Sequence, residues 1–390
     1  MNIIFLSHPT FEGHQSMPRF AKMLSTGMHA RGHTVDSWSP APYFYNLSKN
    51  TALQKWLGYL DQYLIFPRYI KRRLPKLPSN TLFVFTDQAL GMWVPTVARR
   101  HHAIHCHDFL ALKSALNEIT ENATSSTGKL YQRLILRGLQ KGINFICVSE
   151  NTRKDLLRFV EKKSINAHVV YNGFHQTFSP INKEEAREQL GRLLKIDLQE
   201  GYLLHIGGNL WYKNRAGVME IYDAWRKKSR RSLPLLMIGE GPDASLKERH
   251  ASSPYAKDIY WFPDVSDETI RLAYGGASVF LFPSLGEGFG WPIAEAMASG
   301  AVVVTTDEAP MSEVAGNAGF LIPRMPNESE AIKQWSHSSA DVVDKILSLS
   351  SGEITEITSK GIENAKRFDT RLALDEIERI YKQIISQTTS

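Results

Sequence analysis

Two glutamates eight positions apart, Glu287 and Glu295, belong to the most distinctive stretch of the sequence, SLGEGFGWPIAEAMASG at residues 284–300. An apolar run at residues 279–282 precedes it, and a helix is expected to begin near Pro292. Glycines let a backbone approach a ligand closely, and a helix N-terminus offers free N–H groups to hydroxyl or phosphate oxygens. The two carboxylates could hold two different hydroxyl-bearing parts of one ligand, since a carboxylate that accepts from vicinal hydroxyls is a familiar way to hold a ribose or a hexose. The alternative is a capping box beside a solvated glutamate.

Further glycines and polar residues follow apolar runs that predict strands. They are Gly13, His107, Asp108, Gly207, Gly208 and Gly239. Ligands of open parallel sheets bind at the carboxyl ends of the strands. We therefore expect these residues to contribute to ligand sites at those ends.

The spacing of apolar residues predicts two successive series of strands alternating with helices. Strands are expected at residues 2–7, 34–38, 81–86, 103–106, 145–149 and 169–171, and then at 202–206, 235–238, 259–262, 279–282 and 301–305. Helices are expected at residues 17–31, 150–162, 182–195 and 213–226. Such alternation indicates parallel sheets with crossover helices. The predicted fold class is α/β, with two Rossmann-like doubly wound domains facing across a cleft.

The length and the restart of the pattern predict the domains. A chain of 390 residues is expected to form two domains, or three. We expect an N-terminal domain over residues 1–178, a C-terminal domain over 179–370, and a helix within 371–390 that crosses back to the first domain.

The composition, with 43% hydrophobic and 22% charged residues, is that of an ordinary globular protein and excludes disorder for the bulk of the chain. No run of 18 apolar residues predicts a membrane span. The N-terminal MNIIFLSHP predicts a first strand rather than a secretion signal. Only Cys106 and Cys147 occur, which excludes a disulfide framework and predicts a cytoplasmic protein.

The charge is unevenly distributed. Residues 1–178 hold 22 Lys and Arg against 10 Asp and Glu, a net charge of +12, whereas residues 179–390 hold 24 against 30, a net charge of −6. A basic half favours nucleic acid, anionic lipid or a phosphorylated substrate, or is simply a solubilising surface. No recognised nucleic-acid motif occurs, so no nucleic-acid partner is expected.

Residues 54–76 combine aromatic and aliphatic residues with the cations Lys71, Arg72 and Arg73. Such a stretch is typical of segments that lie on an anionic membrane surface. The alternative is a packed pair of helices broken at Pro67.

The stretch at 284–300 resembles the E-x7-E element of the fourth family of retaining glycosyltransferases, which have the two-domain GT-B fold. Other elements resemble that family in the same order over about residues 1–370: ARGHTV (30–35), HCHD (105–108), VSENTRKDL (148–156), VYNG (170–173), KN (213–214), IGEG (238–241), Val265 with its neighbours, and EVAG (313–316). The ordered set is more specific than any one match.

The resemblance implies a role for each matching residue. Glu295 would hold the ribose of a nucleotide-sugar donor, Glu287 the hydroxyls of the transferred sugar, and Lys213 the donor diphosphate. His107 would orient the reacting sugar; its alternative reading is a hydrogen-bonded strand-end histidine. The remaining donor-binding positions implied are Gly13, Gly207, Gly208, Val265 near the nucleobase, Gly288, Phe289 and Gly290.

Three departures from the family pattern affect the expected site. Gly208 stands where the family often has Arg or Thr, so Asn209 and Arg215 are the candidates to contact the diphosphate, with solvent exposure as the alternative for Arg215. Trp291 replaces a more usual aliphatic residue and would narrow the sugar pocket. The N-terminal loop of the family usually carries a pair of glycines, and only Gly13 matches that pair here.

No metal or cofactor is expected. The family commonly needs no bound metal, and His105-x-His107 lacks a third ligand at credible spacing. Residues 126–129 (STGK) lack the leading glycine of a P-loop and are predicted to be a loop between helices.

Taken with the resemblance, the sequence predicts a retaining glycosyltransferase that moves a hexose-type sugar from a UDP- or GDP-sugar to a hydroxyl of a glycan or glycolipid in cell-surface polysaccharide assembly. It would lie in the cytoplasm, peripherally at the inner face of the cell membrane. The alternative is a nucleotide-sugar epimerase on a similar fold.

Overall fold

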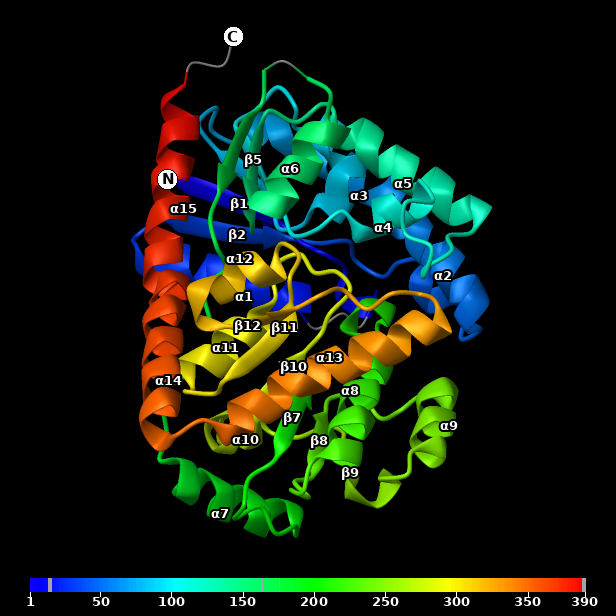
Figure 1. Cartoon of the computed structure of the whole chain (residues 1–390). Helices are drawn as coiled ribbons and strands as arrows, with labels where there is room; N and C mark the ends of the chain where they lie inside the picture. The colour runs from blue at the N-terminus through cyan, green and yellow to red at the C-terminus, as the bar shows by residue number, and fades with distance from the viewer. Residues whose placement is uncertain (13–15, 163, 175, 388–390) are drawn as a thin grey trace. The chain divides into compact units, whose positions relative to one another are not determined.

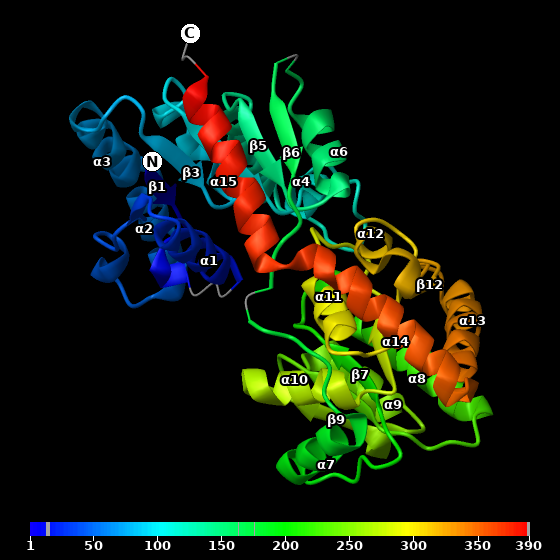
Figure 2. The same cartoon turned by 90° about the vertical axis from the view of Figure 1, so that its left-hand side faces the viewer.

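The computed structural model describes residues 1–12, 16–162, 164–174 and 176–387, and only the backbone of residue 16. The chain forms two compact units, residues 1–175 with 370–390, and residues 176–369 (Figures 1 and 2). The boundary lies three residues before the predicted one at 178/179. Among the described residues, no helix is both long and apolar enough to cross a membrane.

The first unit is built on a parallel sheet of six strands. In spatial order they are β2 (Thr34–Trp38), β1 (Asn2–Leu6), β3 (Leu82–Phe85), β4 (His102–Cys106), β5 (Asn144–Cys147) and β6 (Asn166–Val169). Its helices are α1 (Ser16–Ala30), α2 (Thr51–Leu60), α3 (Phe66–Arg73), α4 (Leu110–Ala115), α5 (Ser126–Leu139), α6 (Glu150–Phe159) and α15 (Thr370–Ser386).

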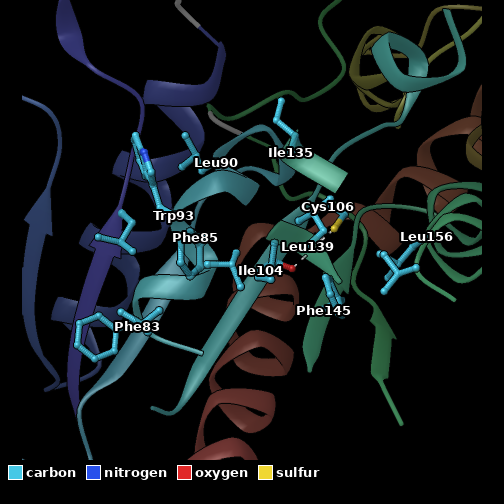
Figure 3. Packing of buried hydrophobic residues seen from close by; sticks show 14 of the residues in the cluster. Phe83, Phe85, Leu90, Trp93, Ile104, Cys106, Ile135, Leu139, Phe145 and Leu156 are labelled. Atoms are coloured by element: carbon cyan, nitrogen blue, oxygen red, sulfur yellow. Dashed lines mark hydrogen bonds between the residues drawn. The ribbon is translucent and has the colours of Figure 1, made fainter. Parts of the chain in front are cut away.

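One face of this sheet packs against α3, α5 and the 3-10 helical segment Gln88–Thr96. Alternate strand residues such as Phe83, Phe85 and Ile104 point to this face and contact Trp93 and Leu139 (Figure 3). His105, between two residues of this core, points to the opposite face, where its Nε2 lies 2.7 Å from the Tyr381 hydroxyl of α15. Helix α15 therefore packs on the second face of the sheet, beside α1 (Figure 2).

The second unit repeats the architecture with its own six-stranded parallel sheet. In spatial order its strands are β12 (Phe320–Ile322), β11 (Val303–Thr306), β10 (Val279–Phe282), β7 (Leu203–Ile206), β8 (Leu235–Ile238) and β9 (Ile259–Phe262). Its helices are α7 (Lys183–Leu194), α8 (Arg215–Lys228), α9 (Ala244–Ser252), α10 (Asp267–Gly276), α11 (Trp291–Ala298), α12 (Met311–Ala315), α13 (Ser329–Ser348) and α14 (Ser351–Ala365).

Helices α8 and α13 cover one face of the second sheet (Figure 1). Their buried residues, including Trp225 and Val343, pack against strand residues such as Met237 and Leu281. Tyr274 of α10 packs on the other face, with its ring 5.3 Å from that of Phe280. The sheet is thus covered on both sides, as expected for parallel strands rich in apolar residues.

Two local predictions were wrong. Residues 126–129 are not a loop but the first turn of α5, because the Ser125 side chain caps this helix by accepting a hydrogen bond from the Gly128 N–H. The strand predicted at residues 169–171 lies instead at Asn166–Val169, at the edge of the sheet. Asn166 and His168 gave this strand too polar a pattern to be recognised.

The stretch at 54–76 is helical on both sides of Pro67. A five-residue π-helical turn, Asp61–Ile65, connects α2 to α3, and Pro67 lies in the first turn of α3. The helix is continuous through this point, and the π-helical turn before Pro67 shifts its hydrogen bonds, with the Phe66 N–H donating to the Asp61 carbonyl, which accommodates a residue that has no N–H to donate. The buried Asp61 carboxylate accepts hydrogen bonds from the backbone N–H groups of Phe44 and Tyr45, which fixes the preceding loop.

Candidate active site

In the second sheet, the order in which the chain visits the strands reverses at the centre, between β7 and β10. From β7 the chain proceeds outward through β8 and β9, and β10, on the other side of β7, begins the run through β11 to β12. In open α/β sheets such a switch point leaves a crevice at the carboxyl ends of the two central strands. Lys213 follows β7 and Glu287 follows β10, so both lie at this point.

Lys213 and Glu287 form an ion pair there. Lys213 Nζ lies 2.8 Å from Glu287 Oε1, and the two side chains are only 15% and 8% exposed. The ammonium also lies 5.1 Å from the centre of the Phe282 ring. A mostly buried pair of this kind keeps a cation and a carboxylate fixed at the strand ends.

Ser284 holds Glu287 in place. Its fully buried Oγ lies 2.7 Å from Glu287 Oε1 and 2.7 Å from the carbonyl oxygen of Tyr212. The Leu285 N–H donates to the same carbonyl at 2.7 Å. The loops that follow β10 and β7 are therefore joined by hydrogen bonds directly beneath the ion pair.

Glu295 lies on α11, inside the second unit. Its Oε2 accepts a hydrogen bond of 3.0 Å from the hydroxyl of Tyr274 on α10. Burial raises the pKa of Tyr274 well above its usual range, so this hydroxyl stays protonated and can only donate to the carboxylate. Gly290 precedes α11 with φ +98°, a conformation that favours glycine, and Pro292 occupies the first turn. Tyr274 thus orients Glu295.

The predicted sugar-lining residues occupy the loop between Glu287 and α11. Phe289 is buried, with its ring 5.2 Å from that of Phe368, and Trp291 begins α11 with its ring 6.3 Å from Phe289. Gly288 joins this segment to Glu287.

The glycine turn after β7 packs tightly against the turn after β8. A Cβ on Gly239, whose φ is +126°, would come 2.2 Å from the Gly207 carbonyl oxygen. A Cβ on Gly208 would come 3.0 Å from Glu240 Oε2, which also accepts a 2.7 Å hydrogen bond from the Asn209 N–H. Gly239 therefore permits close approach of the two backbones, whereas the neighbour of Gly208 is the flexible end of the Glu240 side chain.

The Arg215 side chain packs against these two turns and does not face solvent. It is 3% exposed, donates to the Glu240 carbonyl at 2.7 Å and to Asn209 Oδ1, and lies 4.6 Å from the centre of the Trp261 ring. Burial lowers the pKa of Arg215 to about 10, which leaves the guanidinium charged at neutral pH. Within the described residues, Nε and Nη2 have no hydrogen-bond partner. Arg215 thus places a second fixed positive charge next to the turn.

Val265 lies apart from this group along the sheet. It is half-buried in the turn between β9, the edge strand, and α10, directly after Asp264 with its φ of +53°. The same carboxyl edge of the sheet carries Val265 and the Gly207 turn.

In the first unit, His107 follows β4 and is buried. Its Nε2 lies 3.0 Å from the Thr86 carbonyl, its backbone N–H donates to Gln88 Oε1 at 2.7 Å, and its ring packs edge-on against Phe20. Burial lowers the pKa of His107, so the ring is neutral at pH 7. Because a carbonyl can only accept, Nε2 carries the proton and Nδ1 is the acceptor. Gly13 lies outside the described residues.

His105 has a structural environment. Its hydrogen bond to Tyr381 is fully buried, and burial lowers the pKa of His105 to about 3. In the part of the chain that the structure describes, no three His, Cys, Asp or Glu side chains cluster in a way that could hold a metal ion.

Several residues of these sites were missed from the sequence. His8 and Asp87 follow β1 and β3 and form a 2.9 Å pair, so the strand-end rule that singled out His107 applied to them equally. Tyr274 and Ser284 carried no signal, because their roles depend on how α10 and the loop after β10 pack.

Comparison with known proteins agrees with this architecture. Residues 201–336 match the family described as Glycosyl transferases group 1. The O-antigen chain mannosyltransferase B of Escherichia coli is 30% identical over 188 residues, 47% of this chain and 46% of that protein. A phosphatidyl-myo-inositol mannosyltransferase of Mycobacterium tuberculosis is 23% identical over 298 residues, 72% and 73% of the two chains. The chain spans about half the length of the first curated relatives it matches.

Solved structures resemble the whole chain. Anabaena Alr3699/HepE in complex with UDP and glucose superposes with a TM-score of 0.71 at 15% identity, covering 98% of this chain and all of that one (100%). Sucrose-phosphate synthase from Thermosynechococcus elongatus gives a TM-score of 0.71 at 15% identity, with coverage of 99% and 100%. At this identity the likeness concerns the fold. The second unit therefore carries a glycosyl transferases group 1 domain, and the chain as a whole has the two Rossmann-like halves of the GT-B fold.

Proposed function

We propose that this protein is a retaining glycosyltransferase that moves a hexose from a UDP- or GDP-sugar to a hydroxyl of a glycan or glycolipid. The observation that carries the proposal is the ion pair of Lys213 and Glu287 at the switch point of the second sheet, with Glu295 on the helix that follows. These groups match the chemistry of a sugar diphosphate, which needs cations for its phosphates and acceptors for its hydroxyls.

Charge at the Gly207 turn supports binding of the donor diphosphate there. The Lys213 ammonium lies beside the turn, and the Arg215 guanidinium lies under it with two nitrogens that make no hydrogen bond among the described residues. Both cations are fixed before the donor arrives. They would stabilise the negative charge that builds up on the leaving diphosphate.

The two carboxylates would divide the donor between them. Glu287 accepts from the hydroxyls of the transferred sugar, while Glu295, oriented by Tyr274, accepts from the ribose. Val265 lines the nucleobase through its backbone. The loop residues Gly288, Phe289 and Gly290 border the sugar, and Trp291 limits its size.

The relatives favour mannose as the transferred sugar. The curated relatives named above are mannosyltransferases of O-antigen chains and of phosphatidyl-myo-inositol, whereas the solved Anabaena structure holds UDP and glucose. Mannosyl transfer in cell-surface polysaccharide or glycolipid assembly is therefore the form of the proposal to test first. These relatives support group transfer and lend no support to the epimerase alternative.

The first unit would bind the acceptor. His107 is neutral and donates its Nε2 proton to Thr86, so its ring is held in one orientation. We infer that it positions the reacting sugar without transferring a proton itself.

The surface of α2 and α3 supports peripheral attachment to an anionic membrane. Four apolar side chains are exposed along one side of α2 and the π-helical turn, Leu53, Trp56, Leu60 and Leu64. The exposed cations Arg68, Lys71 and Arg72 continue from them, and residues 66–76 contain no acidic residue. Arg73 is also exposed, and its guanidinium in addition lies 4.7 Å from the centre of the Tyr69 ring.

Product analysis tests the proposal. The protein is incubated with each UDP- or GDP-hexose, including GDP-mannose and UDP-glucose, and with mannose oligosaccharides as acceptors. NMR then follows nucleoside diphosphate release and the anomeric configuration of the product. An α-linked product from an α-configured donor is expected. A β-linked product contradicts retention, and turnover without acceptor to an epimeric nucleotide-sugar contradicts transfer.

A further inference from the structure

The first unit contains a hollow of about 420 Å³ that none of the predicted donor residues lines. Its walls come from α2 and from the segments after β1 and β2. They consist of Phe11, Glu12, Tyr45, Thr51, Gln54, Lys55, Gly58, Tyr59 and Gln62. The volume falls in the usual range for a small-molecule site.

One wall is aromatic. Phe11 and Tyr45 stack with ring centres 4.5 Å apart and planes 28° from parallel. Gly58 of α2 makes room for them, since a Cβ there would lie 3.1 Å from the Phe11 ring and 3.4 Å from the Tyr45 ring. A larger residue at this position of the helix would therefore occupy the hollow or displace the rings.

The other lining residues are polar, and their charges nearly cancel. Glu12 Oε1 accepts a 2.7 Å hydrogen bond from Nε2 of the buried Gln62, which fixes a carboxylate and an amide side by side. Gln54 and Thr51 add hydroxyl-matching groups, and Lys55 balances the charge of Glu12. Fixed carboxylate and amide groups next to an aromatic face suit the hydroxyls and the C–H face of a pyranose, and the balanced charge disfavours a phosphate.

The hollow also lies close to the edge of the sheet that carries His107. Glu12 Oε2 is 3.8 Å from His8 Nδ1, and His8 Nε2 is 2.9 Å from Asp87 Oδ2. The charge of Asp87 acts in turn on His107, opposing the burial that lowers its pKa. Glu12, His8 and Asp87 thus connect the hollow to His107 at the carboxyl end of β4.

We propose that this hollow binds a neutral pyranose of the acceptor glycan, with the sugar packed against the stacked pair of Tyr45 and Phe11 and its hydroxyls on Glu12 and Gln62. This inference rests on the proposed transferase function and specifies where the first unit holds its acceptor. Because it concerns residues of the first unit alone, it can be tested without the donor.

Binding is measured on the full chain by saturation-transfer NMR and calorimetry with α-mannobiose, cellobiose and maltose as probes, and sorbitol as the open-chain control. We expect at least one disaccharide to bind and sorbitol not to. Gly58→Leu keeps a good helix former in α2 but places its side chain in the hollow, and Tyr45→Ala removes half of the aromatic wall. Each is expected to weaken disaccharide binding at least 10-fold.

The matched controls are Gly352→Leu, a helical glycine of α14 whose Cβ would meet nothing within 4 Å, and Tyr43→Ala, a tyrosine that does not line the hollow. Both should bind disaccharide as the wild type does. Binding of GDP-mannose and UDP-glucose is measured on every variant. Loss of disaccharide binding with donor binding intact supports the inference. No disaccharide binding by the wild type, or unchanged binding in Gly58→Leu and Tyr45→Ala, overturns it. Absence of donor binding alone contradicts the proposed function and leaves the acceptor result to stand.

Discussion

Lys213 and Glu287 are 74 residues apart in the sequence, yet Nζ of the first lies 2.8 Å from Oε1 of the second. They meet because β7 and β10 are adjacent parallel strands whose carboxyl ends lie at the same edge of the sheet. The ion pair is only slightly exposed, and Ser284 binds the same carboxylate oxygen. We therefore expect this pair to contribute both to the free energy of unfolding and to glycosyl transfer, and we expect mutations to separate the two contributions.

Removing one member of the pair should destabilise the fold. Lys213→Met leaves a mostly buried carboxylate without its cation, and breaking such a pair costs about 3–5 kcal/mol. The double variant Lys213→Met with Glu287→Gln should recover most of that loss, because no unpaired charge remains. Urea unfolding measures the stability, and glycosyl transfer should stay low in both variants. Recovery of activity together with stability would show that the pair is structural only.

Ser284 is predicted to be a positioning residue for Glu287. Ser284→Ala removes a hydrogen bond to a charged group, typically 1.5–3 kcal/mol, so kcat should fall about 10- to 100-fold. Affinity for the free nucleoside diphosphate should change little, since Glu287 is assigned to the sugar. Steady-state kinetics and calorimetry separate the two effects. Ser350→Ala, which removes only the cap of α14, is the matched control.

Tyr274→Phe tests the orientation of Glu295. Losing the 3.0 Å hydrogen bond should weaken donor binding by roughly 1.5–3 kcal/mol, because Glu295 is assigned to the ribose. Tyr222→Phe removes a comparable buried hydroxyl, bonded to the Leu233 carbonyl at 2.9 Å, and should leave donor affinity unchanged. Equal donor affinities for both variants would remove Tyr274 from the site.

The stability should depend on pH through His8. Burial alone would lower its pKa, but hydrogen bonds and the charges of Asp87 and Glu12 outweigh it and raise the pKa of His8 from 6.5 to about 9. The stabilisation is then fully present below pH 6.5 and is lost as pH rises through 9. The difference corresponds to about 3 kcal/mol at most.

Urea unfolding between pH 6.5 and 9.5 checks this dependence. His8→Gln should flatten the loss of stability over that range, whereas His337→Gln, at an exposed position, should not. The same alkaline loss in all three proteins would mean that His8 is not responsible.

Membrane attachment should depend on the exposed cations of α3. Each cation near an anionic surface is worth about 1 kcal/mol, so Arg68→Gln, Lys71→Gln and Arg72→Gln together should weaken binding to phosphatidylglycerol-containing vesicles by about 3 kcal/mol. Arg73 is retained because its stacking on Tyr69 is structural. Vesicle sedimentation with and without the anionic lipid gives the measurement. If the fraction of protein bound to vesicles does not depend on the anionic lipid, the basic surface serves only solubility.

Most strands could be predicted from the sequence, including the edge strands β2 and β9, whereas contacts between elements could not. The strands at residues 34–38, 235–238, 259–262 and 279–282 were predicted at their observed bounds, three of them because they are short apolar runs ending at glycine or proline. The edge strands β6 and β12 were misplaced or missed, since their residues are polar or few. Tyr274 meets Glu295 only through the packing of α10 and α11, which no spacing encodes.

The most direct test of the donor site is a calorimetric titration of GDP-mannose, UDP-glucose, the free diphosphates GDP and UDP, and the nucleosides guanosine and uridine into the wild type, Glu295→Ala and Lys213→Ala. We predict that one nucleotide-sugar binds, that Glu295→Ala weakens it by roughly 1.5–3 kcal/mol, and that Lys213→Ala weakens the diphosphate while leaving the corresponding nucleoside nearly unaffected. Unchanged affinity in both folded variants, or binding of none of these donors by the wild type, would contradict the assignment of this site.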